Sequence, residues 1–194
     1  DSEYLDIIRE SVENAIDLTQ SAWDLSTVMM DEDVELERRE LAQVIGSQMA
    51  QQEEEFPEAT FELVSIDRAT VAADDMVSAI FRNLLKNAVV HNDKQAPTVE
   101  LSMQQDEETV RVFVADNGPG IPDARKDSVF DKGEKGIDSK GTGLGLFLVE
   151  TVIERFGGDV RVQDGSAAAF EDAAGGPGTV FVVELPTASS EDAV

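Results

Sequence analysis

Apolar side chains recur every three or four residues at the start of the chain, which predicts an α-helix over residues 3–30. The steps alternate between three and four residues, as in a coiled-coil seam, at Leu5, Ile8, Val12, Ala15, Thr19 and Ala22. Ile16, Trp23 and Met30 widen this apolar face. Two interpretations are open: a helix packed on its own domain, or part of a dimeric helical bundle. The wide apolar face, which would be exposed without a partner, favours the bundle.

The rest of the chain predicts a mixture of helices and strands. Helical periodicity covers 39–55, 75–90, 122–129 and 142–156. Alternating or continuous apolar runs predict strands at 34–36, 60–66, 71–72, 98–104, 109–115, 160–162 and 179–185. Because helices and strands do not alternate strictly, the order indicates an α+β fold and not a doubly wound sheet.

Length and composition indicate one domain with a helical appendage. The chain has 194 residues, and its apolar fraction of 41% is enough for a core. Without cysteine and with a single histidine, His91, it can form neither disulfides nor thiolate or multi-histidine metal sites. No apolar run has the length of a membrane span and no signal peptide is present, so we expect a cytoplasmic location. The start at Asp1, without methionine, indicates a fragment.

The charge balance is strongly acidic, with 41 acidic and 15 basic residues and a net charge of −26. Nucleic acid is therefore not an expected partner, because phosphate contacts need clustered lysine and arginine. The acidic residues are spread along the whole chain, a pattern typical of proteins from salt-loving microbes, where dissolved salt screens the repulsion. An ordinary acidic signalling protein is the alternative.

Asp116 stands at the end of an apolar strand and is followed by Gly118 and Gly120. Asn-Gly and Pro-Gly pairs are ordinary turn residues, so a plain surface turn is one interpretation. In the functional interpretation, Asp116 accepts a hydrogen bond from an exocyclic amine, while the glycines let a ring approach the backbone. A buried acceptor would select adenine's amino group over a keto group, because mispairing leaves the acceptor unsatisfied.

Two further motifs point to a phosphate and a metal ion. Gly141, Gly143 and Gly145 precede an apolar helix, where free backbone amides and the helix dipole attract an anion. A flexible glycine loop is the alternative. Asn83 and Asn87 lie four residues apart on an apolar helix, where asparagine is unfavourable. A carboxamide oxygen suits Mg²⁺ when nucleotide phosphates and waters complete its coordination, although either side chain could instead bond the backbone.

Together these residues resemble the catalytic, ATP-binding domain of sensor histidine kinases, in the gyrase/Hsp90/histidine-kinase/MutL superfamily. Asn83-Leu-Leu-Lys-Asn87-Ala88 is similar to the N box, Asp116 to Gly120 to the G1 box, and Gly141 to Leu146 to the G2 box. Phe130 lies where the F box is expected, and Gly176-Pro-Gly178-Thr179 resembles a weaker final glycine box. The resemblance covers residues 34–186. It implies a two-layer sandwich of a mixed β-sheet with helices on one face, the Bergerat-type ATP-binding fold, preceded by a long N-terminal helix.

The resemblance implies ATP and Mg²⁺ as cofactors. Asp116 would bind the adenine amino group, Asn87 would ligate Mg²⁺, Gly141 to Leu146 would hold phosphate, and Thr179 would approach adenine through water. His91 would line the rim of the pocket. Residues 122–140 would form the lid, with Lys132, Lys135 and Lys140 as equal candidates for a phosphate contact. The expected nucleotide-binding residues are Asn83, Asn87, His91, Asp116, Gly118, Gly120, Ile121, Lys140, Gly141, Thr142, Gly143, Leu144, Gly145, Leu146 and Thr179.

Asn83 and Asn87 are the expected catalytic residues, and Asn83 separates two kinds of chemistry. Members of the superfamily that hydrolyse ATP, such as gyrase and Hsp90, place a glutamate four residues before the magnesium asparagine, as general base for water. An amide stands there in this chain, and an amide cannot accept a proton. The resemblance therefore favours phosphoryl transfer to a protein acceptor.

The resemblance also divides the chain. Residues 1–32 would be the second helix of a dimerisation and phosphoacceptor hairpin, 33–187 the ATP-binding domain, and 188–194 a disordered tail. The intact protein is expected to form a homodimer, which could be membrane-attached. It would transfer the ATP γ-phosphoryl group to a histidine on a missing upstream segment, and then to an aspartate of a response regulator. This fragment alone should not autophosphorylate. Two alternatives are an anti-sigma-factor type serine/threonine kinase, disfavoured by the coiled-coil seam, and a regulatory nucleotide-binding module without transfer.

Overall fold

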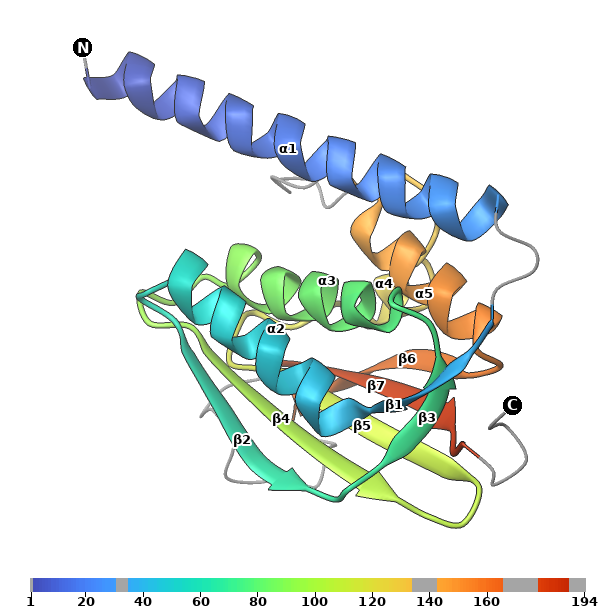
Figure 1. Ribbon diagram of the computed structural model, residues 1–194. Helices are drawn as coiled ribbons and strands as arrows, with labels where there is room; N and C mark the ends of the chain where they lie inside the picture. Colours follow the sequence, from blue (N-terminus) through green and yellow to red (C-terminus); the bar gives the residue numbers. More distant parts are fainter. Residues whose placement is uncertain (1, 31–34, 134–142, 166–177, 189–194) are drawn as a thin grey trace.

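A five-stranded mixed sheet with helices on one face forms the two layers of the molecule (Figure 1). The computed structural model describes residues 2–30, 35–133, 143–165 and 178–188. The strand order is β2 (Thr60–Ile66), β4 (Thr98–Gln105), β5 (Thr109–Asp116), β7 (Thr179–Pro186) and β6 (Asp159–Asp164). β2 runs parallel to β4, and the other neighbours are antiparallel. The predicted α+β class with a mixed sheet is confirmed.

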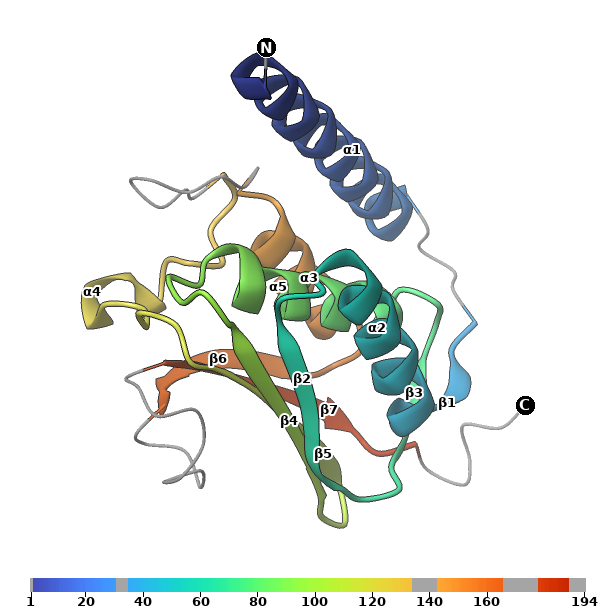
Figure 2. The ribbon, with the colours of Figure 1, turned by 90° about the vertical axis from the view of Figure 1, so that its left-hand side faces the viewer.

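Three helices cover one face of this sheet (Figure 2). They are α2 (Leu41–Glu55), α3 (Val77–Val90) and α5 (Gly145–Arg155). A short helix, α4 (Asp123–Lys126), follows β5, and α1 (Ser2–Met30) extends beyond the domain at the N-terminal end. None of the helices that the structure describes has the combination of length and apolar character needed to cross a membrane.

The core lies between the sheet and the helices. It is formed by apolar side chains that recur at every second residue of a strand and every three or four residues of a helix. Alternate side chains of β5 and β7 face the helices, and α3 contributes apolar side chains at helical spacing. The buried side chains from these three elements include Val110, Val112 and Val114, Phe181, Val183 and Leu185, and Ile80, Leu84 and Leu85. Burial of each large apolar side chain stabilises the fold by about 1.5–3 kcal/mol. This packing fixes α3 over the centre of the sheet.

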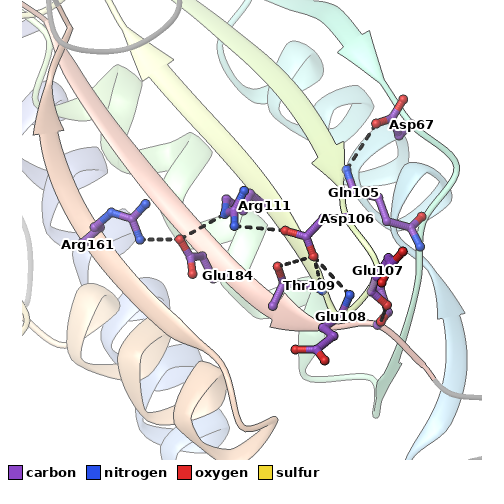
Figure 3. A network of polar contacts seen from close by, with 10 residues as sticks. Asp67, Gln105, Asp106, Glu107, Glu108, Thr109, Arg111, Arg161 and Glu184 are labelled. Atoms are coloured by element: carbon purple, nitrogen blue, oxygen red, sulfur yellow. Dashed lines mark hydrogen bonds and ion pairs between the residues drawn. The ribbon is translucent and has the colours of Figure 1, made fainter.

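The opposite face of the sheet carries a chain of charged contacts (Figure 3). Glu184 on β7 pairs with Arg161 on β6 at 2.5 Å and with Arg111 on β5 at 3.4 Å. Arg111 also contacts Asp106 at 3.0 Å, in the turn between β4 and β5. The backbone amide of Thr109 and other hydrogen bonds of this turn hold the pKa of Asp106 below its usual range. These contacts are at least partly open to solvent, so each contributes little to stability.

One short strand departs from the predicted elements. The structure places β1 at Glu37–Glu40, where it pairs with β3 (Thr70–Ala73) in a separate antiparallel sheet. The predicted strand at 34–36 is wrong at residues 35 and 36, residue 34 lies outside the described residues, and the predicted helix from residue 39 begins at Leu41. The strand sequence Glu-Arg-Arg-Glu has no apolar alternation, so pairing with β3 sets its conformation.

Helix α1 contacts the domain through charged side chains and through Leu25, which is buried in the core, and leaves most of its apolar face uncovered. Asp17 accepts a hydrogen bond from Lys86 of α3 at 2.7 Å, and Lys86 also bonds Glu55 of α2 at 3.0 Å. The buried Asp24 pairs with Arg82, one turn earlier on α3. The exposed apolar side chains of α1 are Tyr4, Leu5, Ile7, Ile8, Val12, Ile16, Leu18, Trp23, Met29 and Met30.

Lowering the salt concentration is expected to destabilise the protein. At a net charge of −26, repulsion acts over about 30 Å at 0.01 M salt but only about 3 Å at 1 M. We expect the melting temperature to rise by about 5 °C from low to molar salt, which corresponds to roughly 2 kcal/mol for a chain of this size. Thermal unfolding in sodium chloride and in potassium chloride should give the same curve at equal ionic strength. A melting temperature independent of salt would remove the halophilic interpretation.

Candidate nucleotide site

Asp116 ends β5 with a buried carboxylate, only 9% exposed. Its Oδ1 accepts a hydrogen bond from the backbone amide of Gly118 at 2.7 Å and a longer one from the amide of Thr179 at 3.4 Å. Burial raises the pKa of Asp116, and the hydrogen bonds from Gly118 and Thr179 partly oppose this rise. A buried carboxylate with one oxygen held by amides is a fixed acceptor, and not the carboxylate of a plain surface turn.

Two glycines let the chain close around Asp116. A Cβ at Gly118 would lie 2.8 Å from Oδ1 of Asp116, and one at Gly178 would lie 2.0 Å from the Asp116 carbonyl oxygen. Gly178 also has a positive φ of 31°. Any other residue at 178 would therefore push the end of β5 away from the start of β7. The weaker final glycine motif thus corresponds to a real close approach between two backbones.

The helix that carries the two asparagines meets the start of α5. Nδ2 of Asn83 donates to the carbonyl oxygen of Ala79 at 2.8 Å, one turn back. A Cβ added to Gly145 would lie 2.8 Å from Oδ1 of Asn83. The first residue of α5 and the Asn83 amide oxygen are therefore in close approach. Asn87, half-buried, follows one turn later on the same helix face.

Helix α3 is also joined to the Asp116 turn. After its last turn, Nδ2 of Asn92 donates to Oδ1 of Asn117 at 2.9 Å. The structure therefore brings α3 against both of the other predicted motifs, at Asn83 and Gly145 on one side and at Asn92 and Asn117 on the other. No sequence pattern indicated Asn92, or the pairing of Asn92 with Asn117 of the G1 motif, since side-chain pairing across distant turns leaves no periodic signal.

The remaining predicted site residues lie near α3, the start of α5 and the turn after Asp116, or outside the described residues. Gly120 has a positive φ of 79°, and Ile121, Leu144 and Leu146 pack half-buried against the core. Gly143 is half-buried, and His91 ends α3 in an exposed position. Three predicted phosphate contacts, Lys140, Gly141 and Thr142, lie outside the described residues, as does Lys135. The predicted tail is described only as far as residue 188.

The described part of the predicted lid contacts the rest of the domain near both of its ends. At its start, Lys126 of α4 bonds Asp164 at the end of β6 at 2.7 Å, a contact that no sequence pattern indicated. Phe130, the predicted F-box residue, is buried with its ring edge toward Phe181, 6.3 Å between centroids. Nζ of Lys132 lies 5.9 Å from the centre of the Phe147 ring on α5. Lys132, the one candidate lid lysine among the described residues, therefore lies beside α5.

The donor set fits a metal ion only in company with a nucleotide. Among the described residues, no group of three or more histidine, cysteine, aspartate or glutamate side chains is arranged to hold a metal. The carboxamide oxygens of Asn83 and Asn87 are neutral ligands that Mg²⁺ accepts when phosphate oxygens and waters supply the rest. The residues present therefore fit Mg²⁺ brought in with a triphosphate, and do not fit an all-protein metal site.

Comparison with known proteins agrees with this geometry. Residues 73–189 match the family described as histidine kinase-, DNA gyrase B-, and HSP90-like ATPase. The sensor histidine kinase DpiB of Escherichia coli K12 is 30% identical over 120 residues, which cover 59% of this chain and 20% of DpiB. The chain thus spans about a fifth of the length of the curated relatives it matches.

Solved structures show the same architecture. The mycobacterial sensor histidine kinase MprB is 25% identical, with a TM-score of 0.68 over 78% of this chain and 97% of that one. Full-length ShkA in complex with AMPPNP matches 97% of this chain and 39% of its own, with a TM-score of 0.73 and 22% identity. ThkA, in complex with the response regulator protein TrrA, matches 96% of this chain and 51% of its own, with a TM-score of 0.70 and 20% identity. The last two likenesses concern the fold.

The family match covers more than half of the chain and includes every motif identified above, from the two asparagines of α3 to the glycine before β7. The chain therefore belongs to the histidine kinase-, DNA gyrase B- and HSP90-like ATPase family, and it has the ATP-binding catalytic domain found in sensor histidine kinases.

Proposed function

We propose that this domain binds ATP together with Mg²⁺ and serves phosphoryl transfer to a histidine in the intact protein. The observation that carries the proposal is the convergence on α3. One side of this helix meets the glycine-rich start of α5 at Asn83, and its end is bonded to the turn of Asp116. A purine at the Asp116 end and phosphates at the α5 end would then span one continuous site.

The residues have separate tasks in this site. Asp116, with Oδ1 already held by amides, would offer its other oxygen to the adenine amino group. The amides and the dipole at the start of α5 would hold phosphate, and Asn87 would offer an oxygen to Mg²⁺. When bound, Mg²⁺ neutralises charge on the phosphates during transfer. Such fixed electrostatic contacts and positioning account for most of the catalysis expected in phosphoryl transfer.

Asn83 supports transfer over hydrolysis. Its Nδ2 already donates to the backbone of α3, and its Oδ1 lies against Gly145. An amide in this position cannot take a proton from water, so the described residues on α3 supply no general base for hydrolysis. A substrate hydroxyl or imidazole from another segment is then the expected acceptor, and the relatives named sensor histidine kinases favour imidazole.

Helix α1 supports a dimeric assembly. Its exposed apolar side chains follow the spacing of a coiled-coil seam, and such a face is stable only against a partner. We infer that it is the second helix of a hairpin that pairs with another copy, and that the first helix carries the acceptor histidine. A response regulator would then receive the phosphoryl group. The ThkA–TrrA complex, which has the same fold, supports this partner.

A labelling experiment tests the proposal. The chain alone, with radiolabelled ATP and Mg²⁺, should bind nucleotide but incorporate no label. A longer protein that includes the segment before Asp1 should sediment as a dimer and acquire label that is stable to base and labile to acid, as expected for phosphohistidine. The same protein with its upstream histidine changed to alanine is the control. Acid-stable label would indicate a serine or threonine acceptor, and label on the short chain alone would contradict the proposal.

A further inference from the structure

Two asparagine side chains fasten α3 to the turn that carries Asp116. Nδ2 of Asn92 donates hydrogen bonds to the carbonyl oxygen of Ala88 at 3.2 Å and to Oδ1 of Asn117 at 2.9 Å. The same Asn117 oxygen accepts the backbone amide of Thr98, at the start of β4, at 3.0 Å. Three separate segments therefore meet at one side-chain oxygen, one residue away from the proposed adenine acceptor.

The hydrogen bonds fix the orientation of both amide groups. Oδ1 of Asn92 accepts the backbone amide of Lys94 at 3.0 Å, so Nδ2 has to face Ala88 and Asn117. Asn117 uses its oxygen twice, whereas the partner of its Nδ2 among the described residues is the carbonyl oxygen of Ala96 at 3.5 Å, the limit for a hydrogen bond. The arrangement therefore needs a donor at residue 92 and an acceptor at residue 117.

We propose that the Asn92–Asn117 pair is a positioning element that sets the separation between the metal end and the adenine end of the nucleotide site. The inference rests on the proposed function. Asn92 lies two residues beyond the end of the helix that carries Asn87, and Asn117 adjoins Asp116. Both ends must engage the same nucleotide, so a small displacement of α3 relative to the turn would misplace one of them.

The space around the pair supports a positioning role. A Cβ at Gly118 would lie 3.4 Å from both Cγ and Nδ2 of Asn92, so a side chain at residue 118 would crowd Asn92. Gly118 also donates its amide to Asp116. Asn92 therefore lies beside the residue that holds the Asp116 carboxylate, so the pair joins α3 to the turn at a point next to the proposed adenine acceptor.

Two isosteric substitutions test the pair. Asn92→Asp replaces the essential donor with an acceptor facing two carbonyl-type oxygens, whereas Asn117→Asp keeps the acceptor that Asn92 and Thr98 use. Each adds one negative charge at nearly the same place, so the repulsion of an anionic ligand is matched. We expect Asn92→Asp to bind Mg-ATP about tenfold more weakly than Asn117→Asp in calorimetric titrations, the effect of about one buried hydrogen bond.

Titration with metal-free ADP distinguishes a positioning effect of the pair from a general loss of folded protein. This ligand does not engage the metal end, so its affinities for the two variants should agree within about twofold, whereas unfolding would weaken both ligands alike. Should Asn92→Asp fail to fold, Asn92→Ala against the wild-type chain carries the same two expectations. Equal Mg-ATP affinities, or an equal loss for metal-free ADP, would overturn the positioning role. A wild-type chain that binds no Mg-ATP would instead overturn the proposed function.

Discussion

Replacing Asp116 with asparagine is expected to weaken ATP binding by about a hundredfold, or about 3 kcal/mol, without loss of stability. The side chain would keep one oxygen for the amides of Gly118 and Thr179. Its new amino group would face the adenine amino group, and two donors cannot bond each other. GTP presents a keto oxygen there, so the ratio of GTP to ATP affinity should rise. Calorimetric titrations with both nucleotides measure this change.

The exposed Asp93, beyond the end of α3, provides the matched control. Asp93→Asn removes the same charge from a side chain that is 58% exposed, and it should leave the ATP affinity unchanged. If Asp116→Asn bound ATP as tightly as Asp93→Asn, the assigned adenine contact would be wrong. Thermal unfolding of both variants completes the comparison, since Asp116→Asn should melt at the same temperature as the wild-type chain or higher.

The raised pKa of Asp116 determines the direction in which protein stability and ATP affinity each change with pH. Because burial raises this pKa above its unfolded value, the side chain's contribution to stability is fully present below the unfolded pKa and is lost as pH rises through the folded pKa. At neutral pH the buried carboxylate therefore costs stability, and asparagine removes this cost. ATP affinity should move the opposite way and fall on acidification through the same raised pKa, because only the ionised form accepts a hydrogen bond at both oxygens.

Periodicity predicted the elements whose burial is regular. α3 and β5 were located to within two residues because their apolar side chains follow the helix and strand periods over a complete element. β1 was missed because its four charged residues carry no such pattern and depend on β3 for pairing. The strand order could not be predicted either, since period alone does not identify a strand's neighbour.

The sequence indicated candidate site residues at positions where the residue type is unfavourable for the local structure. Asn83 and Asn87 in an apolar helix, and Asp116 before two glycines, are costly choices that indicate a function. Asn92 and Asn117 gave no such signal, because asparagine near a turn is ordinary. Their partnership joins residues 25 apart and exists only once α3 has packed on the sheet. The sequence therefore indicated the candidate nucleotide-binding residues but not the asparagine pair that we propose positions them.

Replacing Gly178 with alanine should destabilise the protein by about 2–4 kcal/mol and weaken ATP binding at least roughly tenfold. The new Cβ would lie 2.0 Å from the carbonyl oxygen and 3.2 Å from the carbonyl carbon of Asp116. Both are backbone atoms, so no side-chain rotation can relieve the overlap, and the positive φ of 31° adds strain. The end of β5 has to move, and the Asp116 carboxylate moves with it.

Gly46→Ala is the matched control, because we expect it to stabilise the protein whereas Gly178→Ala destabilises it. Gly46 lies in the middle of α2, and a Cβ there would meet nothing within 4 Å. Alanine favours the helix by about 0.5–1 kcal/mol, so denaturant unfolding should show stabilisation, with ATP affinity unchanged. If Gly178→Ala were as stable as Gly46→Ala, β5 and β7 would not approach as closely as described. If it were unstable but bound ATP normally, the close approach would serve the fold alone, and Asp116 would not need it to accept the adenine amine.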